Sequence, residues 1–157
     1  MRVFTSIAAA AFLAVGVTAA LAHEFKVGDI EIIHPWTKVP LKGTDVTGGY
    51  MKIVNHGTTP DRLLKVTVDF SKMAQIHAMK MDGNVMKMEE LKDGLEIPAG
   101  GTVELKPKSY HVMFMGVKEK LTADEMVDGE LTFEKAGKVK VEFMVEPATA
   151  DHSMDAM

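Results

Sequence analysis

Hydrophobic and polar residues alternate along several stretches of this chain, which is the pattern of β-strands that bury one face. Residues 62–70 alternate over their whole length, and the apolar side chains predicted to face the core are Leu64, Val66, Val68 and Phe70. Residues 138–145 alternate in the same way, and a turn at 136–137 would pair them with a strand that holds Leu131 and Phe133. Short alternating segments of this kind predict a structure built from β-strands.

Turn-forming residues divide the chain at short intervals. The turn signals are Gly48-Gly49, Asn55-His56-Gly57, Asp82-Gly83, Pro98-Ala99-Gly100-Gly101, Pro107 and Asp128-Gly129. Helical periodicity is absent, apart from one or two turns predicted near residues 117–126. The pattern therefore predicts an all-β fold, an antiparallel Greek-key β-sandwich of about eight or nine strands.

One predicted hairpin carries side chains that could bind a ligand together. Asp-Gly is the signature of a two-residue type I′ turn, and Asp82-Gly83 separates two β-capable stretches, residues 76–81 and 84–90. If those two residues form the loop, Met79 faces Met86 and His77 faces Met88. Directly opposed residues on one face have Cβ atoms about 4.5–5.5 Å apart. We therefore expect His77 and Met88 to be close enough to share a ligand.

A second segment, residues 110–115, alternates as well. Period two places Tyr110, Val112 and Phe114 on one face, which we expect to enter the core. The opposite face then carries His111, Met113 and Met115, and we expect it to lie toward the rim or the solvent. His111 and Met113 point the same way because they are two residues apart on one strand.

Together the two segments supply imidazole and thioether donors. The candidate ligands are His77, Met88, His111 and Met113, separated by ten, 22 and one residue. Thioether sulfur selects Cu(I) over harder ions, and imidazole binds copper in either oxidation state. The chain contains 13 methionines among 157 residues, so a methionine-rich core is the structural alternative. The spacing favours a copper(I) site.

These residues resemble the motif of the periplasmic PCu(A)C-type copper chaperones: a His, ten residues, a Met, about 21 residues, then His-x-Met. The likeness extends over about residues 30–145, and the one departure is a second gap of 22 residues, which we place in a loop near residues 90–94. The resemblance implies a cupredoxin-like fold and a Cu(I) chaperone without enzymatic activity. It also implies a copper acceptor, namely the copper centre of a terminal respiratory oxidase or its assembly factor.

The amino-acid composition excludes several classes of function. The chain has no cysteine, which excludes blue-copper electron transfer, thiol redox chemistry and iron–sulfur clusters. Its formal net charge is −4, and no basic patch suited to nucleic acid is apparent. A monomeric binding protein remains the simplest interpretation.

The N-terminal segment predicts export. Residues 1–22 contain Arg2, an uncharged apolar run and Ala20-Leu21-Ala22, the pattern of a cleavable signal peptide. An uncleaved membrane anchor is the alternative, because the run is long enough to span a bilayer. Cleavage would leave a periplasmic copper-binding domain over residues 23–147, without membrane insertion, and a flexible His/Met tail over 148–157.

Other interpretations stay open at this stage. A structural or adhesion-type β-sandwich with a methionine-rich core would bind no copper. A copper enzyme could use a mature N-terminal His23, whose α-amine and ring can chelate one ion. The tail offers a further weak site through His152, Met154 and Met157. The remaining histidines, His34 and His56, are assigned structural roles, the latter in a turn that tolerates unusual dihedral angles.

Overall fold

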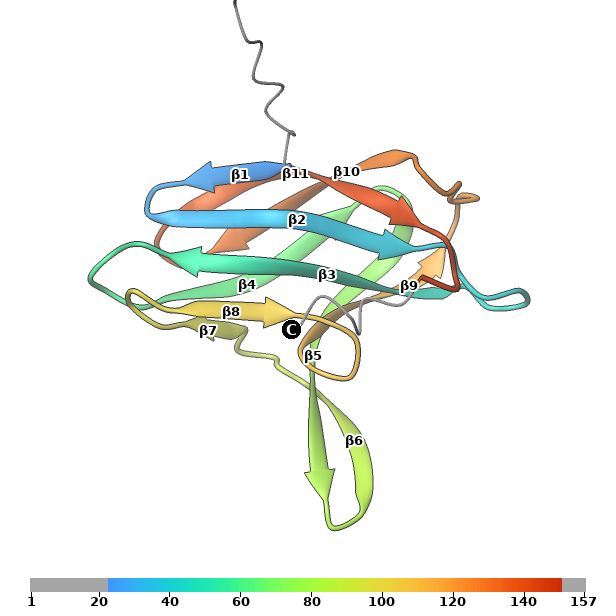
Figure 1. Cartoon of the computed structure of the whole chain (residues 1–157), viewed down its shortest axis with the longest axis horizontal. Helices are drawn as coiled ribbons and strands as arrows, with labels where there is room; N and C mark the ends of the chain where they lie inside the picture. The colour runs from blue at the N-terminus through green and yellow to red at the C-terminus, as the bar shows by residue number, and fades with distance from the viewer. Residues whose placement is uncertain (1–22, 151–157) are drawn as a thin grey trace, which may run out of the picture.

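The computed structural model describes residues 23–150, and this range is entirely β-structure and turns (Figure 1). The strands are β1 (Glu24–Val27), β2 (Ile30–Lys38), β3 (Val46–Asn55), β4 (Asp61–Val68), β5 (Ser71–Asp82), β6 (Val85–Glu90), β7 (Leu95–Ile97), β8 (Thr102–Leu105), β9 (His111–Val117), β10 (Met126–Phe133) and β11 (Gly137–Glu146). The predicted all-β class is confirmed, with more strands than expected. No helix in this range is long and apolar enough to cross a bilayer.

The strands form one continuous hydrogen-bonded sheet. Its order is β6-β5-β9-β3-β2-β11-β10-β4-β7, with β1 paired to β2 and β8 paired to β3. The β2–β11 pair is parallel, whereas the prediction was an entirely antiparallel arrangement. The sheet folds over on itself, so that β10, β11 and β4 lie behind β2 and β3 (Figure 1).

Aromatic side chains fill the space between the two layers. Phe114 of β9 meets Phe143 of β11 with ring centroids 5.7 Å apart, and Phe70 lies 4.9 Å from Phe114. Because β9 and β11 are separated by two strands in the sheet, this contact crosses the core rather than running along one face. The β10–β11 hairpin has the predicted pairing of Leu131 with Val139. Its alternation therefore specifies the core as expected.

Strand β4 departs from the predicted alternation at one position. Leu63 is fully buried, whereas Leu64, predicted to face the core, is 43% exposed. The pairing of β4 with β10 shifts register here, because Phe133 pairs with Leu63 while Thr132 pairs with Lys65. Such a bulge inserts one extra residue and reverses which side chains point inward. Val66 and Val68 beyond the bulge are buried as predicted.

Two dipeptides assigned to turns, Gly48-Gly49 and Asp128-Gly129, lie within strands instead. Gly49 belongs to β3, and a Cβ atom there would lie 2.6 Å from the ring of Phe114. Gly129 belongs to β10, and its Cβ would lie 2.6 Å from the ring of Phe143. Glycine is used in these strands because a neighbouring aromatic ring occupies the space of a side chain.

The β5–β6 hairpin has a different loop from the predicted one. The two loop residues are Gly83 and Asn84, and Asp82 pairs with Val85. Gly83 has a φ of +63°, and glycine at the first central position suits a type II′ turn, whereas Asp-Gly as the loop would form type I′. The prediction that His77 faces Met88 is therefore wrong: His77 faces Glu90, and Met88 faces Met79.

Three further local predictions are corrected. Tyr110, expected in the core, precedes β9 and is exposed. Residues 118–125 contain a turn but no helix. Of the two histidines assigned structural roles, His34 rather than His56 has a positive φ, +47°, and it lies beside a register shift in β2. The predicted signal peptide, and the tail residues His152, Met154 and Met157, lie outside the described residues.

Candidate metal centre

Two histidines face each other on neighbouring strands. His77 on β5 and His111 on β9 are directly paired in the antiparallel register, and their ring centroids lie 5.5 Å apart at an interplanar angle of 71°. Val112 and Phe114 anchor β9 by entering the core, so alternation turns His111 and Met113 to the opposite face. Residues 34 positions apart in sequence are thus brought together by strand pairing alone.

The hydrogen bonding of His111 fixes which ring nitrogen can bind a metal. Its Nδ1 lies 2.9 Å from the carbonyl oxygen of Ser109. A carbonyl only accepts, so Nδ1 carries the proton and Nε2 keeps a free lone pair. The side chain is buried, with 6% exposed, although the prediction placed this face toward the rim or solvent. A backbone partner of this kind is typical of metal-ligating histidines.

The hydrogen bonding of His77 leads to a similar conclusion for its other nitrogen. Its Nε2 lies 2.9 Å from Oε1 of Gln75, whose amide nitrogen donates to the sulfur of Met73 at 3.6 Å. In this arrangement Nε2 donates and Nδ1 holds the lone pair. Nδ1 is buried and has no hydrogen-bond partner among residues 23–150. A buried nitrogen that lacks a partner is costly unless something else binds it.

The surroundings of His77 favour its neutral form. Burial lowers the pKa of His77 below its usual value of 6.5, and the positive charge that His111 can carry lowers it further. Glu90, directly across from His77 on β6, acts in the opposite direction. Because the net direction is downward, the ring is unprotonated at neutral pH and its lone pair is available.

The two candidate thioethers lie on the same face as the histidines, one on each side of the pair. Met113 is paired with Gln75, and Met88 is paired with Met79. Those partners are four residues apart along β5, or about 13 Å at the usual rise per residue. Met113 is half-buried and Met88 is 53% exposed. The structure therefore brings the two histidines together. It places each methionine opposite a β5 residue that is two positions from His77, on either side.

An aromatic wall flanks Met113. Gly48 of β3 is paired with Met113, and a Cβ at Gly48 would lie 2.2 Å from the hydroxyl oxygen of Tyr50, so the tyrosine ring lies across the glycine. Tyr50 in turn packs on Trp36 with centroids 4.3 Å apart. Burial raises the pKa of the Tyr50 hydroxyl. Sequence analysis did not identify this wall or Gln75; the only available signal for Gln75 was its position two residues before His77.

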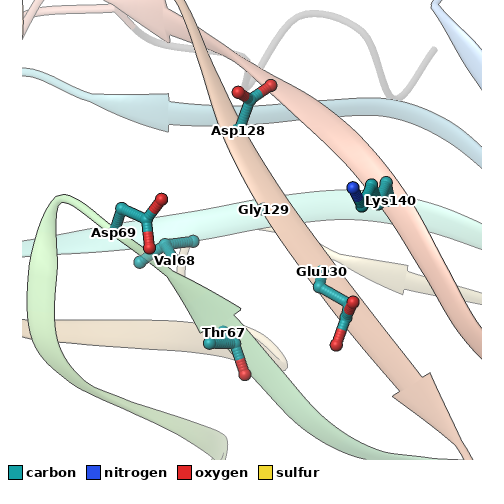
Figure 2. Close-up of a pocket in the computed structure, with 7 residues that line it drawn as sticks. All are labelled: Thr67, Val68, Asp69, Asp128, Gly129, Glu130 and Lys140. Carbon is teal, nitrogen blue, oxygen red and sulfur yellow. The ribbon is translucent and has the colours of Figure 1, made fainter.

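We also searched residues 23–150 for metal sites made of other ligands and for cavities. No group of three or more His, Cys, Asp or Glu side chains gathers there in an arrangement that could hold a metal ion. A separate cavity has a volume of about 350 Å³, and the residues that line it are drawn in Figure 2. It is lined in part by Asp69, Asp128, Glu130 and Lys140. Asp128 and Glu130 belong to β10, Lys140 belongs to β11 and Asp69 directly follows β4; these strands carry none of the four predicted ligands. The histidine pair is therefore not part of a larger His, Cys, Asp or Glu cluster among the residues that the structure describes.

Comparison with known sequences identifies relatives of this domain. The family described as "Putative lipoprotein LpqE-like" matches residues 30–145. The "Putative lipoprotein Lxx21020" of Leifsonia xyli subsp. xyli is 28% identical over 104 residues. That alignment covers 66% of this chain and 61% of the relative, so it spans less than two thirds of the relative's length.

Solved structures share the fold. The copper-bound PCuAC domain from PmoF2 is 30% identical with a TM-score of 0.69, covering 80% of this chain and 98% of that domain. The Cu(I) form of DR1885 from Deinococcus radiodurans, at 24% identity and a TM-score of 0.63, covers 81% of this chain and 83% of its own and supports the fold alone. The sheet and these matches define a cupredoxin-like all-β domain of the PCuAC type. The chain belongs to the LpqE-like family, the PCu(A)C family that its His/Met motif resembles.

Proposed function

We propose that this protein is a periplasmic copper chaperone that binds Cu(I) through His77, Met88, His111 and Met113 and releases it by ligand exchange. The observation that carries the proposal is the buried Nδ1 of His77, which has no hydrogen-bond partner among residues 23–150 and lies in a ring that faces His111. A copper-bound relative at 30% identity supports the choice of metal.

The donor set explains why Cu(I) is the preferred cargo. Neutral imidazoles and thioethers suit a soft monovalent ion, whereas carboxylates and water suit harder divalent ions. On this face the nearest carboxylate is that of Glu90, opposite His77. A shell of neutral donors leaves the charge of the ion uncompensated, so an acceptor that offers stronger ligands can withdraw it.

The separation between the histidines and each methionine along the sheet suggests in which order the ligands of the ion are exchanged. Met88 is exposed on the edge strand β6, whereas His111 is buried. We propose that the exposed sulfur leaves the ion first, and that an acceptor ligand then enters from the solvent side. The family resemblance points to the copper centre of a terminal respiratory oxidase, or its assembly factor, as that acceptor.

The alternative functions fit less well. A structural sandwich with a methionine-rich core would bury its methionines, yet Met81, Met86 and Met88 are exposed and lie outside the core cluster. A copper enzyme would need an open coordination position beside an acid or base. The hydrogen bonds of His77 and His111 are made instead to Gln75 and to a backbone carbonyl.

Anaerobic Cu(I) titration with X-ray absorption at the copper edge tests the proposal. The first ion should show both nitrogen and sulfur neighbours, and the double variant His77→Ala/His111→Ala should lose the nitrogen neighbours and this site. An unchanged first binding event in that variant would contradict the proposal.

Metal selectivity gives a second test of the sulfur donors. Met113→Ala should weaken Cu(I) binding far more than Zn(II) binding, because the thioether supplies the preference for the softer ion. Met115→Ala is the matched control, since Met115 lies on the same face two residues beyond and is not a proposed ligand. Equal losses for both metals in the Met113 variant would argue against a thioether ligand there.

A further inference from the structure

The β5–β6 hairpin extends from the body of the molecule (Figure 1), and one of its faces carries four methionines. The observed register pairs Met79 directly with Met88, and Met81 directly with Met86. Directly opposed side chains have Cβ atoms about 4.5–5.5 Å apart. The tip of the hairpin therefore presents thioethers in two adjacent cross-strand pairs.

These methionines do not serve the hydrophobic core. Met81, Met86 and Met88 are 58%, 44% and 53% exposed, and all four hairpin methionines lie outside the core cluster. Exposed apolar side chains on an edge strand are a liability that proteins usually avoid with charged residues. Their presence here indicates a role for the sulfur atoms.

The opposite face of the same hairpin shows what an ordinary solvated surface looks like. Four of its six residues are charged, and they form two ion pairs, Lys80 with Glu89 at 3.4 Å and Lys87 with Asp82. Charge and sulfur are thus separated onto opposite faces. No carboxylate shares the thioether face closer to the tip than Glu90, which lies at the base opposite His77.

We propose that Met79, Met81 and Met86 form a second metal site at the hairpin tip, an all-thioether site for a soft monovalent ion such as Cu(I) or Ag(I). Three neutral sulfurs without a hard donor would discriminate strongly against Zn(II) and other harder ions. This site is separate from the histidine pair, since it includes no imidazole and does not require Met88.

The position of the tip site gives it a role, which rests on the proposed chaperone function. Met79 is paired with Met88, which is a proposed ligand of the histidine site. An ion captured at the exposed tip can therefore pass from Met81 and Met86 to Met79, then to Met88, without leaving sulfur ligands. The hairpin is then the loading end of the carrier.

Ag(I) is a suitable probe because it is soft and monovalent and, unlike Cu(I), is not oxidised by air. In protein labelled with ¹³C at the methionine methyl groups, titration should shift two groups of signals in two separate equivalents. Met81→Leu/Met86→Leu should lose one of the two equivalents and keep the signal changes of Met113. Leucine is close to methionine in volume and polarity, so the hairpin should remain folded.

The matched control is Met115→Leu, on the same face but beyond the histidines. It should retain both equivalents. If the tip variant still binds two ions, or the control loses an equivalent as the tip variant does, the tip site is wrong.

A third variant separates this proposal from the chaperone function. His77→Ala/His111→Ala should retain one Ag(I) with sulfur neighbours alone. If it binds none, the tip site fails while the histidine site stands. If it retains both ions, the histidine site fails while the tip site survives.

Discussion

Hydrogen bonds made by single residues determine which nitrogen of each imidazole carries a proton. Ser109 holds the proton of His111 on Nδ1, and Gln75 holds the proton of His77 on Nε2. Each ring consequently offers its other nitrogen. Second partners of this kind fix the tautomer and orientation of a ligand before the ion arrives.

Gln75 should therefore matter although it is not a proposed ligand. Gln75→Leu removes the acceptor for the Nε2 proton, and we expect Cu(I) affinity to fall about 10–100-fold, the usual cost of losing an outer-shell partner. Gln75→Glu retains an acceptor oxygen and should bind more tightly than the leucine variant. Competition titration with a Cu(I) chelator measures both, and a leucine variant equal to the wild type would refute the role.

The lowered pKa of His77 should set the pH dependence of the proposed metal binding. At any pH below 6.5, a smaller fraction of this ring is protonated than of a free imidazole, so protons compete with the metal only in more acidic solution. Cu(I) affinity should stay nearly constant from pH 8 to about 6.5 and fall as the pH is lowered further. Competition titrations across this range and below it test the expectation, and an affinity that stays flat at every pH at which the protein remains folded would show that imidazole is not a ligand.

At the scale of strands, alternation predicted the right face more reliably than the right partner. The imidazole–thioether face of β9 and the inward residues of β11 followed from period two alone. The partner of His77 did not, because an Asp82-Gly83 loop and a Gly83-Asn84 loop are both local turn solutions. The choice between the two loops moves every cross-strand pair of the hairpin by two residues. Each side chain therefore stays on the same face of the sheet, but it is paired with a different residue.

The bulge in β4 makes a matched pair of neighbouring leucines. Leu63→Ala should destabilise the protein by about 2–5 kcal/mol, because it leaves a cavity in the core. Leu64→Ala, at an exposed position, should change the free energy of unfolding by about 0.5 kcal/mol or less. Chemical denaturation measures both; comparable losses would mean that the bulge is misplaced.

At the scale of the whole molecule, the class of fold was predictable and its closure was not. Short alternating segments specify strands, but the parallel β2–β11 pair joins segments more than 100 residues apart. Nothing local encodes such a pairing, since it depends on how two layers enclose Phe114 and Phe143. Gly49 and Gly129 leave space for these rings, and this packing role cannot be recognised from the local sequence, in which both glycines look like turn residues.

Metal binding should stabilise the whole fold. The two histidines come from different strands, so the folded state binds the ion better than the unfolded chain does. At free Cu(I) about 100 times the dissociation constant, we expect about 2.7 kcal/mol of added stability. Anaerobic thermal or chemical unfolding with and without Cu(I) measures this gain, and His111→Ala should abolish most of it. Equal stability of the loaded and metal-free protein would contradict the two-strand site.

The pairing of β5 with β9 also fixes an order of events. His77 and His111 lie 34 positions apart and meet only after a long-range strand pair has formed, which is among the slower steps of β-sheet folding. A chain threaded across a membrane in extended form holds neither imidazole near the other. Under the proposed function, such a polypeptide would travel empty and would bind its Cu(I) at the destination.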